Sequence, residues 1–113
     1  MKELKKDPTV KEIQDHLQEF VVLRGWDSKT FPEVFMLFTE EVGELAKSVR
    51  KYIKLHDEEQ DIDNLTEELA DVFNYLMEIA NRTGIDLEQA YRIKYKLNSG
   101  RLWPGDIKNS IEN

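Results

Sequence analysis

Two short acidic clusters contain the residues of this chain with the clearest capacity for chemistry. The sequence EEVGE contains Glu41 and Glu44, and the sequence EELAD contains Glu68 and Asp71. In each cluster the two carboxylates stand three residues apart, a spacing that places them on one face of an α-helix. Carboxylates grouped without histidine or cysteine are typical ligands of a hard cation such as Mg²⁺ or Mn²⁺.

The positions of these carboxylates on their helices distinguish them from ordinary surface charges. At about 100° per residue, Glu41 and Glu68 fall inside the apolar arcs of their two helices, and Glu44 and Asp71 lie at the margins. An ionised carboxylate on a core-facing arc must be paired, protonated or bound to a metal. The apolar residues that set these arcs include Val42, Val49, Leu69, Phe73 and Leu76. The acidic residues expected to face water are Glu40, Glu67 and Glu78.

A short turn between these two helices predicts that they pack antiparallel. In both helices the carboxylate pair lies on the same flank of the arc, so antiparallel packing brings the pairs to one side of the interface. The two pairs are also symmetric about position 56, inside the expected turn at residues 56–60. The four carboxylates are therefore predicted to converge. A di-iron bundle is the nearest alternative, but it needs Glu-x-x-His, and neither His16 nor His56 follows a glutamate at that spacing.

Apolar residues recur at intervals of three and four through most of the chain, which predicts an all-α fold with a four-helix, bundle-like core. Thr9 and Thr30 each precede a glutamate by three residues, and Asp86 precedes a glutamine by three, which are signals of helix starts. Gly25 and Gly84 mark the ends of the first and third helices. The helices are expected at about residues 9–24, 30–55, 62–82 and 86–98, in a single domain (residues 1–113) with an ordered core at about 9–104.

The composition limits the class of protein. The chain has 113 residues, of which 40% are hydrophobic and 35% charged, with a net charge of −7. The regular apolar pattern argues against disorder, and the lack of cysteine excludes a disulfide scaffold and thiolate zinc sites. With a pI near 4.9 the chain lacks the basic surface that neutralises nucleic-acid phosphates, so no nucleic-acid polymer is expected as a partner. Neither an apolar run of roughly 18 residues nor a hydrophobic signal segment is present, so a cytoplasmic location without membrane contact is expected.

With both acidic pairs in register, the sequence resembles the MazG-type all-α nucleoside triphosphate pyrophosphohydrolases. Their signature, Glu-x-x-Glu followed after a spacer by Glu-x-x-Asp, is matched here by Glu41, Glu44, Glu68 and Asp71. The chain is most similar to the compact branch that contains dCTP pyrophosphatases. Other segments that carry the resemblance are Arg24-Gly25-Trp26, Gly84-Ile85-Asp86-Leu87 and Lys94-x-x-x-Asn98-x-x-Arg101.

The resemblance implies hydrolysis of a (d)NTP between the α and β phosphates, giving a nucleoside monophosphate and pyrophosphate, as house-cleaning of the nucleotide pool. It implies Mg²⁺, with Mn²⁺ as a substitute, on the four carboxylates, which are also the implied catalytic residues. Water would be activated by the metal or by one of the glutamates. A homodimer or homotetramer is implied as well. In the compact branch a histidine and aromatic residues line the base pocket, and His16, Trp26 and Tyr75 stand at matching positions.

Lys94, Asn98 and Arg101 are candidate phosphate contacts. Lys94 and Asn98 share a helical face with apolar residues, where a lysine can simply extend past apolar surface. Beside a metal–phosphate site, Lys94 would instead neutralise the β or γ phosphate while Asn98 donates a hydrogen bond. Arg101 and Trp103 are expected to fold over the site or over a neighbouring subunit.

The aromatic and histidine candidates have alternative interpretations. Trp26 follows a glycine in a loop, so it either stacks on a base or closes the end of the bundle. His16 lies off the apolar stripe of its helix, which by itself indicates a surface histidine.

Two classes of function follow from these patterns. The first is a Mg²⁺-dependent NTP pyrophosphohydrolase, or a relative from the same superfamily that acts on dUTP or phosphoribosyl-ATP. The second is a helical bundle that binds nucleotide or a partner without turnover. An oligomer is expected, because 113 residues rich in large apolar side chains enclose only a modest core.

Overall fold

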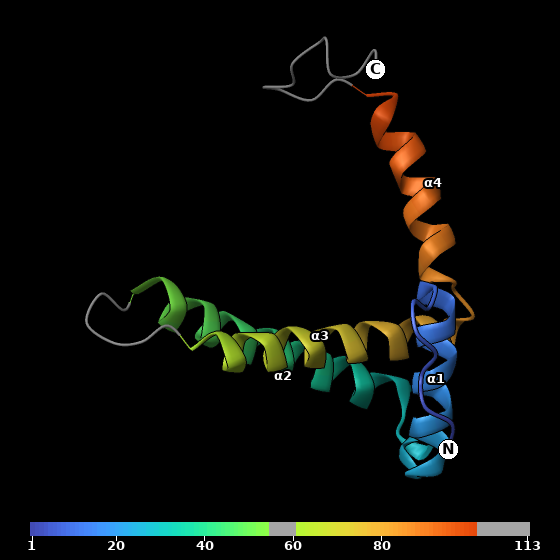
Figure 1. Cartoon of the computed structure of the whole chain (residues 1–113), viewed down its shortest axis with the longest axis horizontal. Coiled ribbons are helices and arrows are strands. Elements are labelled where there is room, and N and C mark those ends of the chain that lie inside the picture. The colour runs from blue at the N-terminus through green and yellow to red at the C-terminus, as the bar shows by residue number, and fades with distance from the viewer. Residues whose placement is uncertain (55–60, 102–113) are drawn as a thin grey trace.

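The computed structural model describes residues 1–54 and 61–101 of the chain. In these residues the chain forms four α-helices, with a short 3₁₀ turn between the first two. They are α1 (Val10–Leu23), η1 (Trp26–Ser28), α2 (Phe31–Lys54), α3 (Ile62–Thr83) and α4 (Leu87–Ser99) (Figure 1). The predicted all-α fold is confirmed. The expected turn at residues 56–60 and the tail that holds Trp103 lie outside the described residues.

The helix ends follow the capping signals of the sequence. Thr9 and Glu12 form the predicted capping box, in which the Glu12 amide donates to the Thr9 hydroxyl. The carboxylate of Asp86 accepts hydrogen bonds from the first amides of α4. Gly25 and Gly84 adopt φ angles of 72° and 71°, the left-handed conformation in which a glycine ends a helix at little cost. The elements therefore begin and end within a few residues of the predicted positions.

Helices α2 and α3 pack antiparallel as a long hairpin, in the middle of which the acidic clusters lie (Figure 1). The Ser48 hydroxyl donates to the side-chain oxygen of Asn64 across the interface at 2.7 Å. Ser48 and Asn64 are symmetric about position 56, as are Glu41 and Asp71. This contact fixes the register in which the predicted symmetry places the acidic clusters opposite each other.

Helix α1 crosses the end of the hairpin and is fastened there by Gln14. The side-chain amide of Gln14 donates to Asn81 at 3.1 Å and to the Ile85 carbonyl at 3.0 Å, while its oxygen accepts from the Leu87 amide at 2.9 Å. Asn81 in turn donates to the backbone carbonyl of Gln14 at 2.9 Å. Gln14 is only 1% exposed, and it joins α1 to the end of α3 and the start of α4.

The expectation that Glu78 faces water is wrong. Glu78 is 7% exposed, because α1 covers the side of α3 that does not contact α2. Its partner is Arg82, one turn further along α3, whose guanidinium nitrogen lies 3.6 Å from the Glu78 carboxylate. The periodicity of α3 identifies its contact with α2, but a helix packed on two sides buries polar residues outside that arc.

Much of the apolar surface of the single chain is uncovered. Among the described residues, the buried apolar side chains are Val21, Val34, Met77 and Ala80. Residues of the predicted core-facing arcs are exposed instead, including Val42, Phe73 and Leu69, the last by 53%. Helix α4 points away from the hairpin (Figure 1), and the radius of gyration is 17.8 Å. A compact domain of this length has a radius near 13 Å, so the chain is extended for its size. None of the described helices combines the length and apolar character needed to span a bilayer.

We predict that Gln14→Ala lowers the free energy of unfolding by about 2–4 kcal/mol, because it removes several buried hydrogen bonds and leaves their partners unsatisfied. Urea denaturation followed by circular dichroism measures this loss. Gln18→Ala, at an exposed position of the same helix, is the matched control and should change the stability by less than about 0.5 kcal/mol. Equal effects of the two substitutions would show that Gln14 does not fasten α1.

Candidate functional site

Three of the predicted carboxylates come together where α2 faces α3. Glu41 projects from α2, and Glu68 and Asp71 project from α3; one oxygen of each lies within 4.8 Å of the others. All three side chains are half-buried. One oxygen of Glu68 is fully buried and has no hydrogen-bond partner among the described residues. A buried carboxylate oxygen without a partner is costly, and a positive group bound here would lower that cost.

Glu44 lies at the edge of this carboxylate cluster. Its side chain is exposed, and its oxygens are not among those that lie within 4.8 Å of one another. Its charge is nevertheless close enough to raise the pKa of Glu41. The structure therefore brings together Glu41, Glu68 and Asp71, and places Glu44 beside them on the solvent side.

The environment of Glu41 disfavours its ionised form. Burial raises the pKa of Glu41 above its ordinary value, and repulsion from Asp71, Glu68 and Glu44 raises it further. Both effects disfavour the ionised carboxylate. A cation placed among these oxygens would reverse both effects.

The donor set suits a divalent cation such as Mg²⁺ or Mn²⁺. The grouped ligand atoms are all carboxylate oxygens, as hard cations prefer, and the orphaned oxygen of Glu68 would gain a partner. When bound, such an ion supplies charge neutralisation for phosphate oxygens and a Lewis acid for activating water. Glu41, Glu68 and Asp71 would hold it.

A cavity of about 270 Å³ opens beside the cluster, between α1, the segment around η1 and the middle of the hairpin. Glu41 and Asp71 form its acidic end. The side chains of Phe20, Trp26 and Tyr75 contribute aromatic walls, a composition that suits a planar ligand with a charged group. The other lining residues are Leu17, Val21, Lys29, Asn74 and Glu78.

Trp26 and Tyr75, two of the predicted base contacts, line this cavity. Trp26 packs edge-on against Phe20, with ring centroids 5.5 Å apart, and remains 42% exposed. The pKa of the Tyr75 hydroxyl is raised by burial and by the neighbouring carboxylates, with Glu41 first among them. Tyr75 therefore keeps its proton and can donate a hydrogen bond within the cavity.

His16, the third predicted base contact, is not brought to the cavity. Its ring nitrogen contacts the backbone carbonyl of Lys2 at 3.1 Å, in a shallow hollow on another side of α1. The neighbouring residue Leu17 lines the cavity instead. One step along a helix turns a side chain by about 100°, which is sufficient to exchange the two faces.

The predicted phosphate contacts on α4 also lie away from the carboxylates of the same chain. Because the Gln14 contact holds the start of α4 against α1, the helix points away from the hairpin (Figure 1). Lys94 and Asn98 on α4, and Arg101 just beyond its end, are exposed and do not line the cavity.

Lys29, Asn74 and Glu78 line the cavity but were not predicted from the sequence. Lys29 stands just before the cap of α2, outside a regular helix. Helical periodicity therefore cannot predict which way its side chain points. Asn74 and Glu78 lie one and two turns beyond Asp71 on α3, so continuing the face of Glu68 and Asp71 along the helix could have found them.

Comparison with models of known protein families identifies a match. The family model described as the MazG nucleotide pyrophosphohydrolase domain matches residues 30–100, which include both acidic clusters, Lys94 and Asn98. No curated protein sequence matches the chain.

We predict that the metal-free protein loses stability as the pH rises above the ordinary pKa of a glutamate, near 4.5. Below that pH Glu41 is protonated in both the folded and the unfolded protein, so its burial and its charged neighbours do not lower the free energy of unfolding. Above it, the unfolded chain releases the proton before the folded protein does, so the free energy of unfolding falls until the raised folded pKa is passed. Glu41→Gln should remove this loss and be more stable than the wild type at neutral pH.

Urea unfolding in the presence of a chelator, at several pH values between about 4.5 and 8, measures the difference. Glu40→Gln, at the exposed neighbouring position, is the control and should follow the wild type. A wild-type protein that is as stable as Glu41→Gln at every pH would contradict the electrostatic account.

Proposed function

The chain belongs to the MazG nucleotide pyrophosphohydrolase family, and from this premise we propose that it is a Mg²⁺-dependent enzyme that converts a (d)NTP into the (d)NMP and pyrophosphate. The observation that carries the proposal is the convergence of Glu41, Glu68 and Asp71 beside a cavity with aromatic walls. We place this activity in the cytoplasm, as house-cleaning of the nucleotide pool.

The acidic end of the cavity would receive the phosphate chain of the substrate. Glu41, Glu68 and Asp71 would hold the Mg²⁺ ion, with Glu44 as an outer ligand or as the group that orients water from the solvent side. Without a cation these residues would repel a triphosphate. This repulsion supports a strict requirement for a divalent metal.

The aromatic end of the cavity would receive the base. Trp26 and Tyr75 offer ring faces for stacking, and the Tyr75 hydroxyl, which keeps its proton, offers a donor. His16 is left out of this proposal because its side chain contacts Lys2 on another side of α1.

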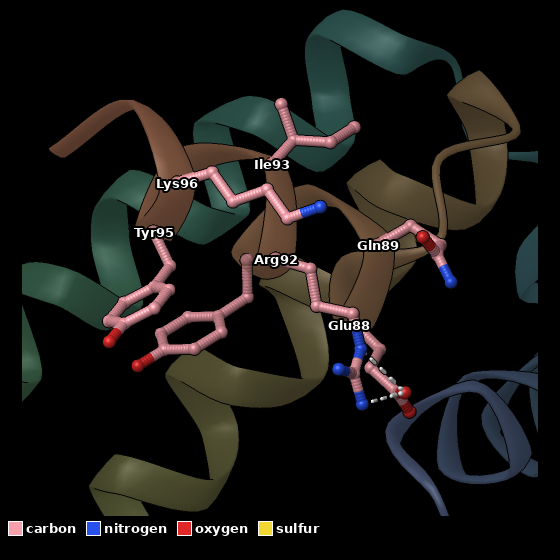
Figure 2. A pocket seen from close by; sticks show the side chains of 7 residues that line it. Glu88, Gln89, Arg92, Ile93, Tyr95 and Lys96 are labelled. Carbon is pink, nitrogen blue, oxygen red and sulfur yellow. Dashed lines mark hydrogen bonds and ion pairs between the residues drawn. The ribbon is translucent and has the colours of Figure 1, made fainter. Parts of the chain in front are cut away.

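We further propose that the working unit is a homodimer, or a dimer of dimers, in which α4 of one copy completes the site of the other. Residues 91–99 of α4 are all exposed, and Tyr91 and Tyr95 stack with ring centroids 6.3 Å apart. Among the described residues, those that line the hollow in Figure 2 all belong to α4. The apolar residues of the hairpin, including Leu69 and Phe73, are uncovered as well. Docking these apolar faces would bury surface that a single chain exposes.

This arrangement gives Lys94, Asn98 and Arg101 a role that they cannot have within one chain, where α4 points away from the hairpin (Figure 1). In a second copy they would approach the outer phosphates from the open side of the site. Lys94 would neutralise the β or γ phosphate as a point charge, and Asn98 would donate a hydrogen bond.

We predict that the purified protein releases the NMP and pyrophosphate from a (d)NTP only when Mg²⁺ or Mn²⁺ is present. Glu68→Gln should reduce the rate at least about 100-fold while retaining the helical spectrum, because it removes a ligand from the cluster. Incubation with each common (d)NTP, starting with dCTP, followed by chromatography of the products, tests this. Release of an NDP and phosphate would reject the assignment, and nucleotide binding without products would favour the non-catalytic alternative.

We also predict that two impaired variants restore activity when they are mixed and assayed at a low substrate concentration. Lys94→Ala should weaken triphosphate binding by about 2–3 kcal/mol, the scale of a charge-assisted contact. In a mixed dimer with Glu68→Gln, one of the two sites has intact carboxylates and an intact Lys94, so random mixing should recover about a quarter of the wild-type activity. A monomeric mass by light scattering, or no recovery after mixing, would show that α4 does not act across subunits.

A further inference from the structure

Lys29 is the one cation among the described residues that line the cavity beside the carboxylate cluster. It is half-buried, and its ammonium group lies 5.4 Å from the centre of the Trp26 ring. Its position in the chain is far from α4, which holds the other candidate phosphate contacts. A half-buried lysine in the lining of the cavity that Glu41 and Asp71 also line is a candidate contact for an anionic ligand.

The backbone of Lys29 is held by hydrogen bonds that do not involve its side chain. Arg82 donates a hydrogen bond to the carbonyl of Lys29 at 2.6 Å, and the amide of Lys29 donates to the carbonyl of Trp26 at 3.2 Å. Arg82 is itself held near Glu78 on α3. The ammonium group of Lys29 lies over the ring of Trp26. The backbone hydrogen bonds of Lys29 do not involve its ammonium group, so a movement of that group would leave them intact.

The contact with Trp26 is weaker than the contact that a phosphate would provide. A cation over an aromatic ring at a partly exposed site contributes little, whereas an ammonium–phosphate hydrogen bond is among the strongest polar contacts in proteins. The same ring is the surface on which we propose that the base stacks. An arriving nucleotide could thus offer a phosphate to Lys29 and take its place on Trp26.

The position of Lys29 selects which phosphate it meets. The Lys29 ammonium group lies beside the Trp26 ring, on which we propose that the base stacks, so the phosphate nearest to it would be the one attached to the sugar. We propose that Lys29 is a substrate-binding residue that contacts the α phosphate from the same chain as the carboxylates, after leaving the face of Trp26. This inference rests on the proposed nucleotide site but not on turnover.

The proposed contact with the α phosphate gives Lys29 a different effect on ligand binding from that of Lys94. The α phosphate is present in both substrate and product, so Lys29 should contribute equally to the binding of a triphosphate and a monophosphate. A contact with the β or γ phosphate, as proposed for Lys94, should contribute to the triphosphate alone. The ratio of the two affinities therefore distinguishes the residues.

The test measures the affinities of dCTP and dCMP by calorimetry in Ca²⁺, which slows turnover, with the adenine nucleotides in parallel. Lys29→Met, which keeps the length of the side chain without its charge, should weaken both ligands by a similar factor of about ten. Lys29→Arg should restore part of the loss. Lys51→Met, at an exposed position of α2, is the control and should leave both affinities unchanged. A loss confined to dCTP, or no loss, overturns the assignment.

A second readout does not depend on nucleotide binding. The chain has two tryptophans, Trp26 and Trp103, so Trp103→Phe isolates the fluorescence of Trp26. In that background Lys29→Ala should make Trp26 more accessible to quenching by acrylamide, and unchanged quenching would show that Lys29 does not rest on the ring. A wild type that binds dCMP as predicted but hydrolyses no (d)NTP would refute the proposed reaction while leaving this assignment intact.

Discussion

The mutual repulsion of three half-buried carboxylates is the constraint on which this structure depends. Glu41, Glu68 and Asp71 are held with their oxygens within 4.8 Å of one another, and one oxygen of Glu68 has no partner among the described residues. The packing of α2 on α3 must overcome this repulsion, and the Ser48–Asn64 contact sets the register in which it does so. A fold that tolerates such strain without a cation gains the capacity to bind one tightly, because a cation removes the strain on binding.

The other elements place a cavity of about 270 Å³ beside these carboxylates. Helix α1, fastened by Gln14, supplies one wall, and the segment from Trp26 to Lys29 supplies another through its contact with Arg82. Helix α4 is directed outward by the same Gln14 contact. The chain thus builds an acidic end and an aromatic end of a site while leaving large apolar faces uncovered. We interpret this combination as half of an assembly, which explains both the extended shape and the distance of Lys94 from the carboxylates.

Features that depend on local interactions or on helical periodicity could be predicted from the sequence, and features that depend on further tertiary contacts could not. Helix ends depend on local caps, so the residues around Thr9, Gly84 and Asp86 indicated them directly. The convergence of Glu41, Glu68 and Asp71 followed from helical periodicity and hairpin symmetry. The burial of Glu78 did not, because it depends on α1 covering a second face of α3. His16 was misplaced because adjacent residues of a helix point to different sides, and its ring contacts Lys2 instead of the cavity. Lys29 was missed because it lies outside a helix, in a segment held by a tertiary contact with Arg82.

The most direct test of the metal site is the thermal unfolding of the protein during titration with Mg²⁺ or Mn²⁺ in the absence of nucleotide. The midpoint of the wild type should rise with metal concentration, by the equivalent of about 2.7 kcal/mol when the free ion exceeds its dissociation constant 100-fold. Glu67→Gln, at an exposed position beside the cluster, should show the same rise, and Glu68→Gln should show almost none. A wild type that gains no stability from either ion, or a Glu68→Gln variant that gains as much, would contradict the account.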